Sequence, residues 1–165
     1  GFTLVELLVV ISIIGVLATV MLGGFYSTQV RGRDSQRKSN IKELANALEL
    51  YLNDYGAYPA ANGSGQIMGC VDGLSVCTWG TSSFTDGKTV YFKQLPKDPV
   101  STSSYYYRIV DSPTNKKYQL YARLENSQDK DCIGGDCANP PSSLPMCGSA
   151  LCNFSLTSAN TTPTE

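Results

Sequence analysis

The chain of 165 residues contains no histidine. Histidine is the commonest general base and the commonest metal-binding side chain, so its absence removes every Ser-His or Cys-His pair. Basic and acidic residues nearly balance, 13 against 14, which leaves a net charge of −1. A chain with this balance lacks the broad basic field of nucleic-acid-binding proteins. We therefore expect neither an enzyme nor a nucleic-acid partner.

Charged residues are also missing from the whole stretch between Leu7 and Val30. It is long enough to cross a bilayer as a helix, for which about 20 apolar residues suffice. A lone carboxylate, Glu6, precedes it, and a carboxylate in an apolar span normally has a partner. With no cation inside the run, we expect that partner to be the chain's own terminal amine, a lipid headgroup or another molecule. The alternative is a plain signal anchor with Glu6 solvated at the membrane edge.

Proline is absent between Phe2 and Tyr55, so one long helix is predicted, roughly 80 Å at 1.5 Å per residue. From Ile41 onward, apolar residues recur at helical spacing with polar residues on the other face. Gly56 and Pro59 predict the end of the helix. Its first half is apolar all round, which suits lipid or a helix bundle, and its second half should pack on a domain.

All six cysteines follow this helix. An even number of cysteines in a loop-rich region suggests disulfides formed in an oxidising compartment. Many pairings are possible, and we prefer the sequential one because near neighbours cost least to bring together. Zinc is the alternative, disfavoured by the spacing and by the missing histidines. The preferred pairs are Cys70–Cys77, Cys132–Cys137 and Cys147–Cys152.

The basic residues just after the apolar run and the disulfides indicate opposite orientations in the membrane. The residues are Arg31, Arg33, Arg37, Lys38 and Lys42. The positive-inside rule would place such a cluster in the cytoplasm, whereas disulfides belong outside. The conflict disappears if a basic leader once preceded Gly1 and was removed after insertion. The cluster could touch anionic headgroups or DNA, but a solvated helix face, or pairing with acidic residues of adjacent subunits, is the commoner arrangement.

An α+β fold is predicted, with a long amino-terminal helical spine packed on a small antiparallel sheet and an irregular, disulfide-stapled carboxy-terminal region. Alternating aromatic and β-branched residues predict strands at Thr89–Gln94, Tyr105–Asp111 and Tyr118–Glu125, with a turn at 112–115. Residues 60–88 are expected to form a long loop. The predicted divisions are 1–30, an apolar half-helix; 31–58, an amphipathic half-helix; 59–153, a globular head; and 154–165, a flexible polar tail.

The beginning of the chain, Gly1-Phe2-Thr3-Leu4-Val5-Glu6, resembles the class III signal of type IV pilins and type II secretion pseudopilins. The stretch from Leu95 to Pro99, LPKDP, is similar to the major pseudopilin. The resemblance implies cleavage by a prepilin peptidase between Gly1 and Phe2 and N-methylation of Phe2. It also implies that Glu6 of one subunit accepts the terminal ammonium, on Phe2, of its neighbour.

The same resemblance bears on helix continuity. Many pilins have a helix-breaking proline where this chain has Gly23, followed by Gly24. Glycines cost about 1 kcal/mol each relative to alanine in a helix. We therefore expect local loss of helical hydrogen bonds between Gly15 and Gly24 when the subunit assembles.

The function expected from these features is that of a structural subunit, a major pilin that polymerises into an extracellular type IV pilus-like filament. Its partners would be identical subunits, inner-membrane lipid before assembly, and the peptidase and assembly machinery. The subunit would lie in the cell membrane first and in the extracellular pilus afterwards. The alternatives are a major pseudopilin of a type II secretion system and a membrane-anchored binding domain that never polymerises.

A calcium site is a further expectation, at Asp129, Asp131 and Asp136. These carboxylates lie near glycines that permit a tight turn, and oxygen ligands at such spacing can hold Ca²⁺. The major pseudopilins that the chain resembles have a calcium site in their terminal loop. The segment lacks full EF-hand spacing, however, and a solvated disulfide loop is the simpler interpretation. No other cofactor is expected.

Overall fold

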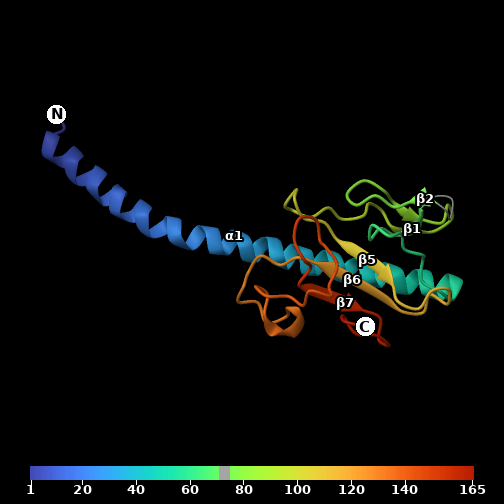
Figure 1. Cartoon of the computed structure of the whole chain (residues 1–165). Coiled ribbons are helices and arrows are strands. Elements are labelled where there is room, and N and C mark those ends of the chain that lie inside the picture. The colour runs from blue at the N-terminus through green and yellow to red at the C-terminus, as the bar shows by residue number, and fades with distance from the viewer. Residues whose placement is uncertain (71–74) are drawn as a thin grey trace.

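The computed structural model describes residues 1–70 and 75–165; the side chains of residues 20–23 also lie outside the description. One helix, α1 (Leu4–Tyr55), runs for 52 residues and carries the rest of the chain on its second half (Figure 1). It ends as its sequence predicts. Gly56 adopts a left-handed conformation (φ 68°), and its N–H donates to the carbonyl of Leu52 at 2.7 Å.

The second half of α1 buries an apolar face. Ile41, Leu44 and Leu48 are at most 1% exposed and belong to the main core of the head. Polar residues between them, such as Lys42 and Asn46, face solvent. Burial of each large aliphatic side chain contributes about 1.5–3 kcal/mol. The head is therefore fixed to α1 by its core and not only by the connecting backbone.

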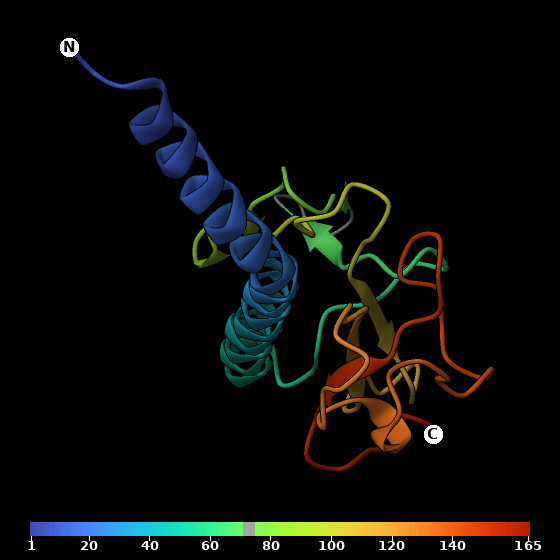
Figure 2. The same ribbon diagram turned by 90° about the vertical axis from the view of Figure 1, so that its left-hand side faces the viewer.

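Within the described residues, the head contains three small antiparallel sheets. The largest has the order β5-β6-β7, in which Leu120 of the central strand pairs with Tyr107 on one side and Leu156 on the other. Figure 2 shows α1 along one side of the head, and α1 contacts β4, β6 and β7. The strands are β1 (Met68–Cys70), β2 (Ser75–Val76), β3 (Phe84–Thr85), β4 (Val90–Phe92), β5 (Tyr106–Ile109), β6 (Tyr118–Ala122) and β7 (Phe154–Thr157).

Two sequence predictions about the head were wrong. Residues 60–88 are not a single loop, because β1, β2 and β3 lie within them. The segment 154–165 is not a free tail, because Phe154–Thr157 forms β7 in the largest sheet. The residues after β7 also pack back: the carbonyl of Pro163 accepts a 2.7 Å hydrogen bond from the Tyr121 hydroxyl. A four-residue strand followed by Ser, Asn, Thr and Pro carries too little periodicity to stand out from a polar tail.

Disulfides close three short loops of the head. The joined pairs are Cys70–Cys77, Cys132–Cys137 and Cys147–Cys152, the sequential pairs preferred from the sequence. The second loop contains the short 3₁₀ helix η1 (Ile133–Gly135). Each bridge joins residues five to seven positions apart. The bridges therefore stabilise individual loops and do not tie distant elements together.

Candidate functional site

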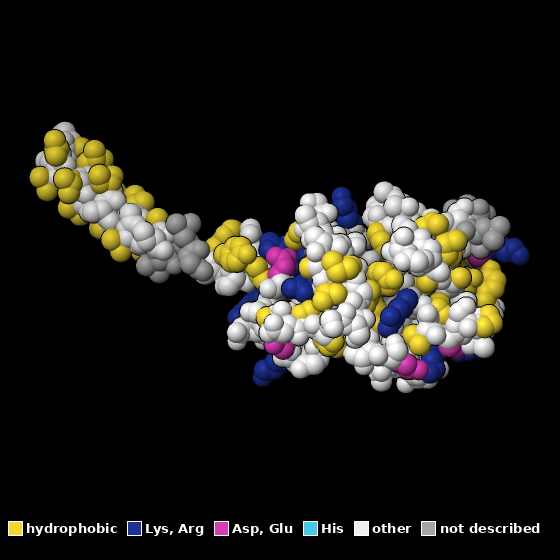
Figure 3. Space-filling model, viewed as in Figure 1, with side chains coloured by type: hydrophobic (Ala, Val, Ile, Leu, Met, Phe, Trp, Pro, Cys, Tyr) yellow, Lys and Arg dark blue, Asp and Glu magenta, His cyan; other side chains and the backbone are white. Residues whose placement is uncertain are grey.

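The first half of α1 projects from the head without any covering (Figure 1). We call the part of α1 before Val30, which is the first buried residue among the described side chains of the helix, the stalk. Its described large apolar side chains are about half exposed or more, and Phe2 just before it is 94% exposed. The most apolar window has a mean hydropathy of 2.7 and none of it is buried. Within the described residues, α1 is the one helix long and apolar enough to cross a membrane. Figure 3 shows the apolar surface of the stalk beside the mixed surface of the head.

Hydroxyl groups on the stalk donate hydrogen bonds to backbone carbonyls of the same helix. The Ser12 hydroxyl donates to the carbonyls of Leu8 and Val9 at 3.0 and 2.8 Å, and Thr19 donates to Val16 at 2.8 Å. A hydroxyl bonded to its own helix in this way needs no water or partner. These side chains are therefore compatible with hydrocarbon surroundings, which leaves Glu6 as the one charged side chain in the described part of the stalk.

Glu6 has a partner that the sequence analysis missed. Its Oε2 accepts hydrogen bonds from the backbone N–H and the hydroxyl of Thr3, at 2.8 and 2.7 Å. The Glu6 N–H donates in return to the Thr3 hydroxyl at 3.3 Å. This reciprocal arrangement is a capping box, which satisfies donors at the start of a helix. The spacing Thr-x-x-Glu before an apolar run would have revealed it. No described hydrogen bond uses Oε1 of Glu6.

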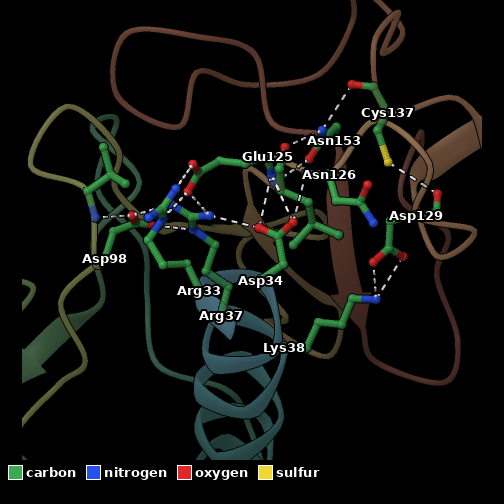
Figure 4. Close-up of polar contacts among 12 residues, drawn as sticks. Arg33, Asp34, Arg37, Lys38, Asp98, Glu125, Asn126, Asp129, Cys137 and Asn153 are labelled. Atoms are coloured by element: carbon green, nitrogen blue, oxygen red, sulfur yellow. Dashed lines mark hydrogen bonds and ion pairs between the residues drawn. The ribbon is translucent and has the colours of Figure 1, made fainter. Parts of the chain in front are cut away.

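Where the stalk meets the head, α1 is joined to the head by buried ion pairs (Figure 4). Arg37 is fully buried, and its guanidinium donates to both oxygens of Asp98 at 2.8 Å. It also donates to Asp34 at 2.8 Å and to Glu125 at 2.6 Å. Asp34 in turn accepts from the backbone N–H of Glu125 and Asn126. One guanidinium thus holds three segments together, and the paired, hydrogen-bonded state is what makes its burial tolerable.

Two neighbouring cations of the helix also pair within the chain. Arg33 forms a two-bond contact with Glu125, and Lys38 lies 2.7 Å from a carboxylate oxygen of both Asp129 and Asp131. Hydrogen bonds from Arg33, together with those from Arg37, lower the pKa of Glu125 to about 2. The prediction that this cluster is a solvated face, or pairs with adjacent subunits, was wrong for Arg33, Arg37 and Lys38. Their partners lie on the chain's own head.

The three aspartates predicted to bind calcium do not converge. Asp129 and Asp131 share the ammonium of Lys38, whereas Asp136 accepts from the amide of Asn139 at 2.9 Å. In the described part of the chain, no group of three His, Cys, Asp or Glu residues is placed to hold a metal. The geometry assembles a salt bridge at this position, and calcium binding stays a prediction.

The glycines expected to weaken the helix lie within α1. The helix is continuous through Gly15 and Gly24, and an added Cβ at either would meet open space. Gly23 belongs to the segment whose side chains lie outside the described residues. The predicted loss of helical hydrogen bonds concerns the assembled filament, so it stays a prediction for the filament.

Several known proteins are similar to this chain in sequence. The model of the prokaryotic N-terminal methylation motif matches residues 1–22, the segment with the capping box and most of the stalk. The type II secretion system core protein G of Escherichia coli K12 is 34% identical over 99 residues, 60% of this chain and 65% of that protein. The type IV major pilin protein PilA of Myxococcus xanthus is 38% identical over 58 residues, 35% of this chain and 26% of that protein. The chain is thus similar in sequence both to a type II secretion core protein G and to a type IV major pilin.

The extent of this similarity differs between relatives. The chain spans less than two thirds of the length of the Escherichia coli and Myxococcus xanthus proteins. Core protein G of Pseudomonas aeruginosa is 29% identical over 143 residues, 84% of this chain and 95% of that protein. No solved structure gives a significant match. The sequence similarity to core protein G therefore extends from the stalk into the head.

Proposed function

We propose that the chain is a structural subunit, not an enzyme, that polymerises through its stalk into an extracellular pilus-like filament. The observation that carries the proposal is the bare apolar stalk fixed to a folded, disulfide-stapled head. Each large apolar side chain left in water costs about 1.5–3 kcal/mol relative to burial. The stalk therefore needs a cover, which is lipid before assembly and the stalks of other subunits afterwards.

Glu6 supplies the register of that assembly. Apolar helices gain little from one another in lipid, so a charge pair can decide their relative position. Thr3 occupies Oε2 of Glu6, and Oε1 is available to the terminal ammonium of an adjacent subunit. Phe2 would carry that ammonium after cleavage by a prepilin peptidase between Gly1 and Phe2, and would then be N-methylated. The methylation-motif match over residues 1–22 supports this processing.

A second function has a specific observation in its favour. The match to core protein G of Pseudomonas aeruginosa covers 84% of this chain, more than the match to PilA covers. This favours a major pseudopilin, whose filament would serve a type II secretion system. Electron microscopy of sheared cell-surface material separates the two functions, because a pilus subunit is found in surface filaments at native expression and a pseudopilin is not.

The proposal is tested with two variants of one residue. Glu6→Ala removes both the charge and the capping contacts, whereas Glu6→Gln keeps a side chain that can complete a capping box. If the charge sets the register, both variants insert into the membrane and neither forms filaments. Glu43→Gln, the same change at an exposed site of α1, is the matched control and should assemble normally. Normal filaments from Glu6→Gln would reduce Glu6 to a helix cap, and filaments from Glu6→Ala would refute the assembly mechanism.

A further inference from the structure

A polar hollow of about 420 Å³ lies beside α1 where the stalk ends. Helix residues from the first turns after Val30 line one side of it, including Arg31 and Lys38. The segment after β6 lines the other side, including Asp129, Lys130 and Asp131. Lys38 and Asp129 at its wall are visible in Figure 4. The hollow is thus built jointly by the helix and the head.

Two cations of this hollow differ from their neighbours. Lys38 is paired with Asp129 and Asp131. Arg31 and Lys130, by contrast, are exposed and make no ion pair within the described residues. Asp34, the remaining carboxylate of the wall, is paired with Arg37 outside the hollow. The charged side chains of the lining sum to zero, but Arg31 and Lys130 are the two lining cations without an ion-pair partner among the described residues.

The position of the hollow along α1 determines which layer of the membrane it faces. The uncharged run from Leu7 to Val30 is roughly 36 Å long at 1.5 Å per residue, and the hydrocarbon core of a bilayer is about 30 Å thick. When the stalk spans that core, Arg31 lies in the layer of lipid headgroups. Lys130 lines the same hollow and so faces the same layer.

We propose that this hollow binds the phosphate of an anionic phospholipid, with Arg31 and Lys130 as the recognising cations. A phosphatidylglycerol headgroup brings a phosphate without a cation of its own to the unpaired Arg31 and Lys130, whereas a zwitterionic headgroup brings a further cation beside them. Basic residues at a membrane surface each strengthen attraction to anionic lipid by about fivefold. The site would seat the head on the membrane surface until the stalk is withdrawn for assembly. It rests on the membrane-anchored stage of the proposed function and is independent of polymerisation.

The experiment is lipid titration of the full chain in detergent micelles, followed by native mass spectrometry. Phosphatidylglycerol and phosphatidylcholine with identical acyl chains are compared, so that binding of the chains to the stalk cancels. We expect phosphatidylglycerol to bind at least tenfold more tightly. The double variant Arg31→Gln/Lys130→Gln should lose this preference. The matched double variant Lys88→Gln/Lys93→Gln, at two exposed lysines outside the hollow, should keep it.

Three results would overturn the site. They are equal binding of the two lipids by the unaltered chain, a preference that survives in Arg31→Gln/Lys130→Gln, and complete competition by inorganic phosphate, which would indicate a free-anion site. Thermal unfolding of both double variants verifies that the head is intact. Because unassembled subunits are measured, a chain that never forms filaments can still pass, and a failure here leaves the filament proposal untouched.

Discussion

At the scale of single residues, three of the cations that follow the stalk, Arg33, Arg37 and Lys38, hold the helix to the head. Arg37 is fully buried, and its bidentate partner Asp98 lies 61 positions away in the sequence. No periodicity or local motif links two residues so far apart. A cluster of basic residues on a helix therefore looks the same in the sequence whether it faces water or closes a core. The LPKDP stretch has a physical role here, since it supplies the carboxylate that neutralises Arg37.

Asp98→Asn is predicted to destabilise the head strongly. The substitution leaves the shape of the side chain but removes one charge from a buried pair, and breaking such a pair costs about 3–5 kcal/mol. Urea unfolding followed by circular dichroism measures the change. Asp129→Asn, which weakens the more exposed pair with Lys38, is the control and should cost about 1 kcal/mol or less. Equal costs for the two variants would contradict the structural weight given to Arg37.

Acid stability gives a second prediction at this scale. Hydrogen bonds from Arg33 lower the pKa of Glu125 to about 2 from its ordinary 4.5. A lowered pKa means that the ionised form stabilises the fold, fully above about pH 4.5, and that this contribution disappears as the pH falls towards 2. We expect Glu125→Gln to lower the melting temperature at pH 7. Between pH 4.5 and 2, the melting temperature of the variant should fall less than the melting temperature of the unaltered chain. Parallel melting curves over that window would contradict the assignment.

At the scale of elements, long sequence patterns predict the helix and the aromatic strands, whereas the other short strands were not predicted. The proline-free run and the apolar spacing of Ile41, Leu44 and Leu48 predict α1, and Gly56 predicts its end. The aromatic runs predict β4, β5 and β6, although the strands are shorter than expected. The short strands β2, β3 and β7 lie outside such aromatic runs, depend on neighbours in space and leave little periodicity in the sequence. The capping box of Thr3 and Glu6, by contrast, is a local pattern that the sequence alone displays.

The stalk gives the prediction at this scale. We expect residues between Gly15 and Gly24 to lose helical hydrogen bonds in the filament, because glycine lowers the cost of unwinding by about 1 kcal/mol per residue relative to alanine. A filament map at side-chain resolution tests this directly. Gly15→Ala and Gly24→Ala are useful companions, since an added methyl group meets open space at both sites in the isolated chain. Unbroken helix throughout the filament stalk would refute the prediction.

At the scale of the whole molecule, the two halves of α1 lie in different surroundings. The stalk exposes its apolar side chains, and the same helix, beyond Val30, is buried by a head with its own core. The overall division could be predicted from the sequence, because the uncharged run ends where the amphipathic pattern begins. The junction could not, because its ion pairs join α1 to loops that follow β4 and β6.

The three disulfides also have a mechanical consequence. All six cysteines are used within short loops of the head, so no covalent cross-link joins α1 to the head except the backbone at Gly56, at the far end of the helix. A pull on the stalk along its axis therefore loads the helix–head interface in shear. In shear, the apolar contacts and the Arg37 ion pairs bear force together and do not open one after another. The head therefore resists tension through its packed contacts and ion pairs with α1, none of which depends on a disulfide bond between helix and head.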